Sequence, residues 1–173
     1  MDEMSTQEHK AEAPKQVCCM VITVSDTRTV DTDKSGQLMM QLLEEAGHIA
    51  RLYQIVKDEP AEVIAAIEVG MADPDVQVIL LNGGTGISPR DNTFEAVKGL
   101  LEKEMPGFGE LFRMLSYTED IGSAAILSRA IAGTRKGKAI FSTPGSTGAV
   151  RLAMNKLIVP ELGHVVRELH KKA

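Results

Sequence analysis

The run Val17–Val24, with the sequence VCCMVITV, constrains the fold more than any other part of the chain. It is apolar and β-branched and lacks the alternation that a half-exposed strand would show. Such a run predicts a strand buried on both faces, as in a parallel sheet covered by helices. Two later runs, Ile49–Val56 and Val76–Leu81, also predict strands, and Ala139–Ser142 predicts a short last one.

Segments with helical signals separate these strands. One helix is expected to begin near Ser35, a good N-cap residue, and to end at Gly47, and a second is expected to open at Pro60. Further helices are expected over Thr93–Lys103, Phe108–Leu115, Ser123–Ile131, Thr147–Val159 and Pro160–His170. Strands that alternate with helices predict an α/β fold, with a mostly parallel sheet covered on both faces.

A basic turn, Thr134–Gly137, precedes the last predicted strand and could form a hairpin. If Arg129–Gly133 pairs across that turn, it forms an antiparallel strand at the end of the helical segment before it. We therefore expect a mixed sheet of five or six strands.

The chain has 173 residues, which is the usual size of one domain. Residues 1–16 are polar and charged, and we expect a flexible N-terminal tail there, followed by one domain over residues 17–173. The tail lacks the apolar core of a signal peptide, and no apolar run approaches the length that spans a bilayer. These features predict a cytoplasmic protein that does not enter membranes.

Charge and motif searches exclude several classes of function. The chain has 19 basic and 24 acidic residues and no long basic run, which argues against nucleic-acid binding. The segment Gly133–Ala139 is a near miss to a phosphate-binding P-loop, but its glycine spacing is one residue short and it precedes a strand. The adjacent Cys18 and Cys19 are interpreted as reduced residues packed on a strand.

A glycine-rich loop follows the third predicted strand. Its backbone N–H groups could form a binding site for an anion, because glycine lets a ligand approach the backbone closely. Arg90 could clamp a phosphate, and Asp91 could hold a hydrated Mg²⁺. The alternative is a plain strand-to-helix turn with Asp91 or Asn92 as the N-cap. The loop positions proposed to bind the anion are Gly83, Gly84, Thr85 and Gly86.

Other polar residues follow the remaining strands. Asp58 ends the second strand, where it is either an N-cap or a functional carboxylate at the same edge of the sheet as Asp91. Two carboxylates there could share magnesium, or one could act as a base. Ser146, after the last strand, could cap a helix and also donate to an anion, and Ser25–Thr27 is a weaker loop of the same kind.

Five motifs, in order, resemble the MoaB/MogA family of molybdopterin-binding proteins of molybdenum cofactor biosynthesis. The clearest is LNGGTGISPRDNTFEAV at 81–97. The others are VSDTRTVDTDKSG at 24–36, AGH at 46–48, EMPGFGELFRMLS at 104–116 and FSTPGSTGAV at 141–150. The resemblance extends from about Val17 to the C-terminus, which is nearly the whole chain.

This resemblance implies a three-layer α/β/α fold that assembles as homotrimers, or as homohexamers in the MoaB branch. It implies that the terminal phosphate of molybdopterin attacks the α-phosphorus of ATP with Mg²⁺ as cofactor, giving adenylylated molybdopterin and pyrophosphate. Molybdopterin and ATP are then the substrates, and other enzymes of the pathway are implied partners. The protein would contribute positioning and charge neutralisation.

The resemblance also assigns residues. Asp58 and Asp91 correspond to the essential aspartates of the family, which implies catalytic and magnesium-binding roles for both. The implied substrate-binding residues are Ser25, Asp26, Ser35, Gly83, Gly84, Thr85, Gly86, Arg90, Pro144, Gly145 and Ser146.

Two departures from the family pattern bear on activity. Phe94 stands where a helix-starting proline is common, and PGST at 144–147 replaces the PG-x-P of the adenylyltransferase branch. The second departure favours the MoaB branch. The leading hypothesis is an enzyme that adenylylates molybdopterin, and the alternatives are a non-catalytic oligomeric pterin-binding module and an unrelated nucleotide binder that needs no pterin.

An apolar cluster after the Pro-Gly break at 106–107 has two interpretations. Its residues either pack in the core or form a subunit interface, and the resemblance favours the interface. The cluster consists of Phe108, Leu111, Phe112, Met114 and Leu115.

Overall fold

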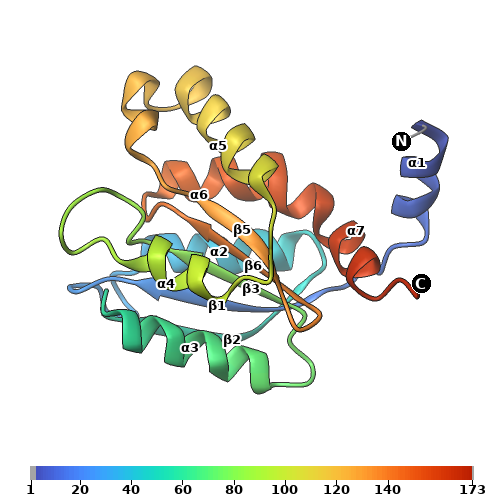
Figure 1. The fold of residues 1–173 in the computed structure, drawn as a ribbon, viewed down its shortest axis with the longest axis horizontal. Coiled ribbons are helices and arrows are strands. Elements are labelled where there is room, and N and C mark those ends of the chain that lie inside the picture. The colour runs from blue at the N-terminus through green and yellow to red at the C-terminus, as the bar shows by residue number, and fades with distance from the viewer. Residues whose placement is uncertain (1–2, 173) are drawn as a thin grey trace.

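A computed structural model describes residues 3–172 of the chain, and a six-stranded sheet forms its centre (Figure 1). The strands lie in the order β2-β1-β3-β6-β5-β4. Their bounds are β1 Cys18–Val24, β2 Ile49–Val56, β3 Val78–Asn82, β4 Lys103–Glu104, β5 Ile131–Arg135 and β6 Lys138–Thr143.

The sheet is mixed and mostly parallel, as predicted. β1 pairs in parallel with β2 and β3, and β3 pairs in parallel with β6. β5 is antiparallel to β6 and to the short edge strand β4. The β5–β6 hairpin closes through Lys136 and Gly137, which have φ angles of 45° and 78°, and two residues with positive φ suit the right-handed twist of a hairpin. The predicted antiparallel strand is confirmed, but it begins two residues later than expected.

Helices cover both faces of the sheet, which confirms the three-layer α/β/α fold. Adjacent residues of β1 explain why its sequence does not alternate, because Val21 belongs to one apolar core and Ile22 to the other, and both are fully buried. The first core packs against α2, α5, α6 and α7, and the second against α3 and α4. The helices are α2 Lys34–Glu45, α3 Pro60–Ala72, α4 Thr93–Leu100, α5 Pro106–Glu119, α6 Thr147–Ala153 and α7 Val159–Leu169.

The first helix after β1 begins differently from the prediction. Its N-cap is Asp33, whose Oδ1 accepts the N–H of Gly36 at 3.0 Å. Ser35 is not the N-cap, because the buried Asp33 carboxylate takes that position and leaves Ser35 inside the first turn, where it contacts another loop. Asp33 is a better acceptor here than a serine hydroxyl because its second oxygen can accept further hydrogen bonds.

Three helical expectations were wrong in part. Residues 123–131 were expected to be helical, with a turn into strand before Gly133 as the alternative; Gly122–Leu127 is a 3₁₀-helix, η1, and the strand β5 begins at Ile131. The helix expected over Thr93–Lys103 stops at Leu100 because the backbone of β4 pairs with β5. Between α6 and α7, Met154–Ile158 forms a π-helix, η2. Pro160, two residues further on, lacks the N–H that α-helical hydrogen bonding would use.

Residues 3–11 form a helix, α1 Glu3–Ala11, within the segment expected to be a flexible tail. This helix is connected to α7 by ion pairs: Lys10 lies 2.6 Å from Glu161, and Glu12, just after the helix, lies 2.6 Å from Arg167. The expected mobility stays a prediction, as does the domain boundary at residue 17. Both cysteines are free, and Cys19 is buried. Within residues 3–172, no helix is long and apolar enough to cross a bilayer.

Candidate functional site

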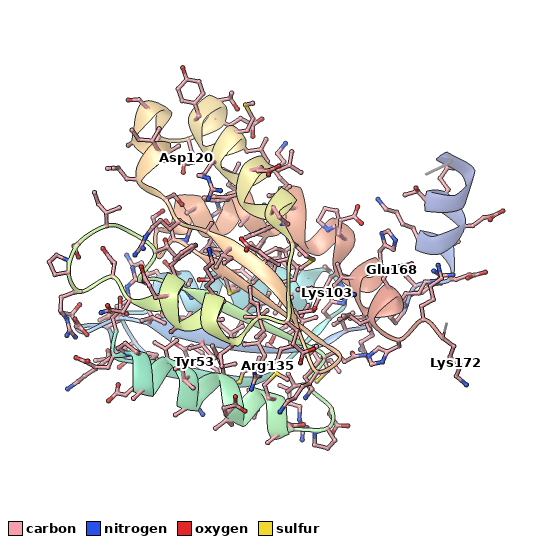
Figure 2. All side chains as sticks on the ribbon, in the orientation of Figure 1. Tyr53, Lys103, Asp120, Arg135, Glu168 and Lys172 are labelled. Carbon is pink, nitrogen blue, oxygen red and sulfur yellow. The ribbon has the colours of Figure 1, made fainter. Side chains whose placement is uncertain are left out.

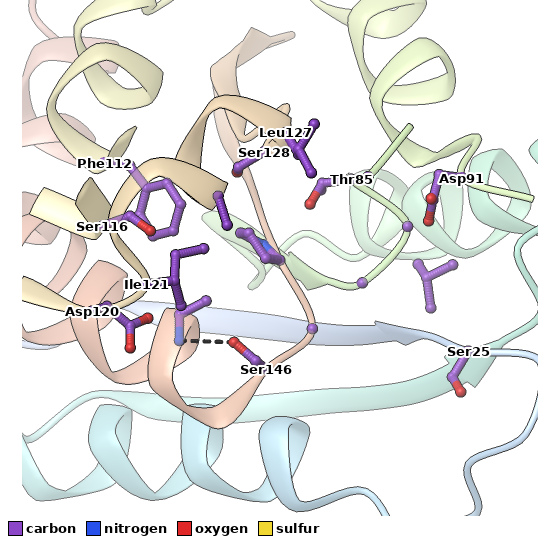
Figure 3. Close-up of a pocket in the computed structure, with 18 of the residues that line it drawn as sticks. Ser25, Thr85, Asp91, Phe112, Ser116, Asp120, Ile121, Leu127, Ser128 and Ser146 are labelled. Atoms are coloured by element: carbon purple, nitrogen blue, oxygen red, sulfur yellow. Dashed lines mark hydrogen bonds between the residues drawn. The ribbon is translucent and has the colours of Figure 1, made fainter. Parts of the chain in front are cut away.

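A cavity of about 460 Å³ lies at the carboxyl edge of the parallel strands, where ligands bind in α/β folds (Figure 3). Loops after β1, β3 and β6 form one part of its wall, and α5 and η1 form the other. The structure brings nine of the predicted site residues to this wall: Ser25, Gly83, Gly84, Thr85, Gly86, Asp91, Pro144, Gly145 and Ser146.

The glycine loop after β3 requires glycine at two positions. Gly83 and Gly84 have φ angles of 104° and 68°, which favour glycine. A side chain at Gly83 would place its Cβ 2.2 Å from the carbonyl oxygen of Val24, and a side chain at Gly84 would place its Cβ 2.0 Å from Oγ1 of Thr93. The loop therefore packs against neighbouring chain segments in a single backbone conformation.

This loop offers hydrogen-bond donors to the cavity. In the described chain, the backbone N–H groups of Gly84, Thr85 and Gly86 donate to no protein acceptor. The loop after β6 adds a capped helix terminus, because Oγ of Ser146 accepts the N–H of Ala149 at 3.1 Å. Unpaired N–H groups at such a surface bind anions. The predicted capping role of Ser146 is confirmed, while its contact with a ligand stays a prediction.

Asp58 is buried behind the glycine loop, and 6% of its surface is exposed. It does not cap its own helix, since the N-cap of α3 is Glu59. Instead, Oδ1 of Asp58 accepts the N–H of Asn92 at 3.1 Å, and so anchors the start of α4. Burial raises the pKa of Asp58, the N–H of Asn92 opposes this shift, and the negative charge of Asp91 adds to it.

Asp91 lies in the cavity wall (Figure 3). Its Oδ2 accepts the N–H of Ser88 at 2.9 Å, which closes the turn within the loop. The N-cap of α4 is Asn92, whose side chain makes no capping hydrogen bond. Asp91 therefore does not act as a helix cap, and in the described chain its Oδ1 accepts no hydrogen bond.

Both aspartates were predicted to hold magnesium, and of the two only Asp91 lies in the cavity wall, whereas Asp58 is buried. Both flank the glycine loop, since Oδ2 of Asp58 faces Gly84 and Oδ2 of Asp91 faces Gly86. Mg²⁺ prefers oxygen ligands and is usually held by one or two carboxylates together with substrate phosphates and water. Across residues 3–172, no three acidic, histidine or cysteine side chains gather as a metal cluster. Phosphate oxygens would therefore have to complete the coordination.

Four predicted site residues do not line the cavity: Asp26, Ser35, Asp58 and Arg90. Arg90 forms a bidentate ion pair with Asp26, at 3.1 and 3.0 Å, and a second pair with Glu59 at 2.6 Å. The hydrogen bond from Arg90 lowers the pKa of Asp26. A phosphate would have to compete with these carboxylates for Arg90. Ser35 is buried and donates its hydroxyl to the carbonyl of Gly145 at 2.6 Å, so it supports the loop after β6.

Arg28 supplies a positive charge to the cavity wall, and the sequence reasoning did not name it. Its Nη2 donates to the carbonyl of Gly145 at 2.8 Å, and its Nη1 lies 3.7 Å from Oδ1 of Asp33. Asp33 is fully buried and accepts hydrogen bonds from the hydroxyls of Thr23, at 2.6 Å, and Tyr53. Burial and the hydrogen bond to Asp33 raise the pKa of Tyr53. The sequence signal that could have identified Arg28 is its position in a loop that directly follows a strand.

Arg129 holds the glycine loop from its other side. Its backbone N–H donates to the carbonyl of Thr85 at 2.9 Å, and its Nε donates to the carbonyl of Gly86 at 2.8 Å. Its Nη2 donates to the carbonyl of Asp91 at 3.0 Å, and the guanidinium pairs with Glu95. The sequence reasoning placed this residue at a helix-to-strand transition and gave it no role.

The α5–η1 wall was also missed, because the search covered only loops that follow strands. It brings apolar and polar side chains to the cavity from a part of the chain that looked like ordinary core. These residues are Phe112, Ser116, Asp120, Ile121, Ala124, Leu127 and Ser128.

Comparison with known proteins identifies what this chain is similar to. Residues 20–164 match a family model described as "probable molybdopterin binding domain". The chain is 63% identical to a molybdenum cofactor biosynthesis protein B of Halalkalibacterium halodurans over 168 residues, which cover 97% of this chain and 99% of that protein. It is 64% identical to the protein of the same name from Bacillus subtilis, with the same coverage.

A solved structure has the same fold. The crystal structure of a molybdenum cofactor biosynthesis protein B superposes with a TM-score of 0.90 and is 61% identical in sequence. The match covers 93% of this chain and the whole of that chain. The expected three-layer α/β/α fold is therefore confirmed both by the structure of this chain and by the crystal structure of a related protein.

Proposed function

This chain belongs to the family of molybdopterin-binding domains, and on this premise we propose that it binds molybdopterin in the cavity at the strand ends and adenylylates it with Mg-ATP. The reaction would serve molybdenum cofactor biosynthesis. One observation carries the proposal most directly: Gly84, Thr85 and Gly86 line a cavity of about 460 Å³, and within residues 3–172 their backbone N–H groups donate to no protein acceptor. Such a donor set suits the phosphates of both substrates.

The proposed step transfers an adenylyl group between two phosphates. An oxygen of the terminal phosphate of molybdopterin forms a bond to the α-phosphorus of ATP. The bond from that phosphorus to the bridging oxygen breaks, and pyrophosphate leaves with the electron pair. Catalysis of this kind needs alignment and neutralisation of charge more than covalent chemistry from the protein.

Residues of this chain would supply both the alignment of the two phosphates and the neutralisation of their charge. Arg28 lies in the wall, held by Gly145 and Asp33, and places a positive charge where phosphates gather. Asp91 and Asp58 would hold magnesium, which neutralises charge on phosphate oxygens during the transfer. Arg129 donates to the carbonyls of Gly86 and Asp91. It would therefore hold the N–H donors of the glycine loop and the carboxylate of Asp91 in fixed positions relative to one another.

Two other functions remain as alternatives. A non-catalytic pterin-binding module would keep the fold and the cavity but release no pyrophosphate. An unrelated nucleotide binder would bind ATP without any dependence on a pterin. Pyrophosphate release from Mg-ATP, measured with and without molybdopterin, separates all three. Release only when molybdopterin is present supports the proposal, and molybdopterin binding without release supports the module.

We also propose that the chain assembles as a homotrimer or homohexamer. Of the apolar cluster in α5, Phe108 and Phe112 pack in the core, whereas Leu111 and Met114 are 55% and 60% exposed. The exposed pair supplies apolar surface of the kind that subunit interfaces bury. Light scattering should give a mass three or six times that of the chain, and a mass near 18.7 kDa would contradict this.

A further inference from the structure

Hydrogen bonds hold the side chain of Arg129 only within the plane of its guanidinium. Its Nε donates to the carbonyl of Gly86, its Nη2 donates to that of Asp91, and both Nη atoms donate to the carboxylate of Glu95. The N–H groups of a guanidinium form a flat fork, so all these bonds lie at its edge. They fix the direction in which the fork points, and its two faces can be restrained only by packing.

The ring of Phe94 covers one of these faces. The Cζ of Arg129 lies over the ring, 5.0 Å from its centroid. An aromatic face attracts a cation at this distance, and the attraction is stronger where water is excluded. Phe94 is partly buried against the core beside α3 and α4, and the Arg129 side chain is 28% exposed. The ring therefore restrains the guanidinium in the one direction that its hydrogen bonds do not.

The first turn of α4 supplies both kinds of restraint, because Phe94 and Glu95 are consecutive residues of that turn. The same turn also binds the glycine loop directly. The backbone N–H of Thr93 donates to the carbonyl of Gly84 at 3.2 Å, and Thr93 is fully buried. One helical turn thus contacts the start of the loop directly and its end through Arg129.

We propose that Phe94 is a positioning residue, which holds Arg129 and through it the carbonyls of Gly86 and Asp91 in the alignment that adenylyl transfer needs. The role in transfer rests on the proposed function. Phe94 stands where proline is common in the family, and a proline ring has no aromatic face to place over a guanidinium. The departure noted in the sequence therefore has a use in this chain.

A simpler explanation is that Phe94 only fills the core beside α4. An apolar side chain without an aromatic face would then serve as well, and its effect would not depend on Arg129. The ring also lies near a second cation, since Nζ of Lys98 is 5.5 Å from its centroid. The experiment must therefore separate packing, Lys98 and Arg129.

The kinetic experiment uses the full chain with Phe94→Leu, Phe94→Tyr and, as a control, Lys98→Gln. Pyrophosphate release with molybdopterin gives kcat and the KM for Mg-ATP, and thermal melting checks the fold. Phe94→Leu should lower kcat roughly 3- to 10-fold and change KM less than ~2-fold, because small misplacements cost rate in aligned transfers. Phe94→Tyr keeps the aromatic face, so it and Lys98→Gln should stay within ~2-fold of the wild type.

A double-mutant cycle with Arg129→Gln tests whether the ring acts through the cation. In that background, Phe94→Leu should change kcat less than ~2-fold. The same loss of kcat in both backgrounds would show that Phe94 only packs in the core, and it would overturn the inference.

The NMR signal of the Arg129 Nε–H, in protein containing ¹⁵N-labelled arginine, gives a measurement that needs no activity. A proton over an aromatic face is shielded, so this signal should lie at higher field in the wild type and Phe94→Tyr than in Phe94→Leu. The signal of Arg135 should not move, because that side chain donates to Leu100 and Glu68. Figure 2 shows Arg135 near α3, well apart from the loop between β3 and α4.

The two measurements distinguish failure of this inference from failure of the proposed function. Identical Arg129 signals in the wild type and Phe94→Leu would overturn the inference even if the wild type is active. A wild type that releases no pyrophosphate would contradict the proposed function and the role of Phe94 in transfer, and the spectrum would still decide whether Phe94 holds Arg129.

Discussion

The carboxylate of Asp58 accepts the backbone N–H of Asn92 across 3.1 Å, which joins the end of β2 to the start of α4. The contact links two residues that lie 34 positions apart in the sequence. It places Asp58 behind the glycine loop, with Oδ2 close to Gly84. Asp58 is therefore both an anchor for the loop and a candidate for magnesium, and substitutions can separate the two roles.

The anchoring role predicts different stabilities for two variants of Asp58. Asp58→Asn keeps an acceptor oxygen for the N–H of Asn92, so the melting temperature should stay close to that of the wild type. Asp58→Ala leaves that N–H unsatisfied and should lower the free energy of unfolding by about 1–3 kcal/mol. Thermal and urea unfolding measure both. Equal stabilities for the Asn and Ala variants would show that the hydrogen bond does not anchor α4.

The raised pKa of Asp58 predicts how its substitution depends on pH. The folded protein holds the Asp58 proton more tightly than the unfolded chain does, so this group contributes less stability as pH rises above its ordinary pKa of 3.8. The Asp58→Asn variant has no carboxyl at this position, so it does not lose this stability as the pH rises. Its stability relative to the wild type should therefore rise between pH 4 and pH 7 in urea unfolding.

Asp26 provides the opposite case for the same measurement. The hydrogen bond from Arg90 lowers its pKa, so its contribution is present above 3.8 and is lost as pH falls through the lowered pKa. Asp26→Asn should lose relative stability as pH rises. Parallel trends for the two variants would contradict the assigned directions.

Arg129 should control the alignment of the glycine loop. A lysine at this position carries the charge but cannot donate to Gly86, Asp91 and Glu95 together. Arg129→Lys should lower kcat for pyrophosphate release by roughly 10- to 100-fold, because small misplacements are costly in aligned transfers. Arg135→Lys is the control, since that side chain donates to Leu100 and Glu68, outside the cavity wall. The same loss in both variants would refute a specific role.

Gly84 should not tolerate a side chain. Gly84→Ala combines a φ of 68° with a Cβ 2.4 Å from Oδ2 of Asp58, and it should destabilise the protein by about 1–3 kcal/mol. Gly99→Ala in α4 is the matched change, because nothing lies within 4 Å of its Cβ and alanine favours helices. That variant should be as stable as the wild type or slightly more so. Melting temperatures distinguish the two.

The sequence predicted those features that depend on local pattern. The run Val17–Val24 predicted a doubly buried strand, and residues 82–92 predicted a glycine loop at a cavity, because both signals lie within a few consecutive residues. Ser35 was misassigned as a cap because the competing carboxylate of Asp33 becomes buried only in the folded chain.

Contacts between distant segments could not be predicted in this way. Asp120 lines the cavity from just after α5, and Arg129 holds the glycine loop from just before β5, and nothing in their own neighbourhoods signals these positions. The ion pair of Arg90 with Asp26 spans 64 residues and depends on the order of the strands. Such contacts follow from topology, which local periodicity does not specify.

Pyrophosphate release from Mg-ATP in the presence of molybdopterin tests the central claim most directly. It should be measured for the wild type, Asp58→Asn, Asp91→Asn and, as a charge-matched control, the exposed Asp31→Asn. We expect release by the wild type and Asp31→Asn only with molybdopterin, and a loss of at least ~10²-fold in the other two variants, since metal-directed charges are worth several kcal/mol. A wild type that binds molybdopterin without releasing pyrophosphate, or activity that survives both substitutions, would contradict it.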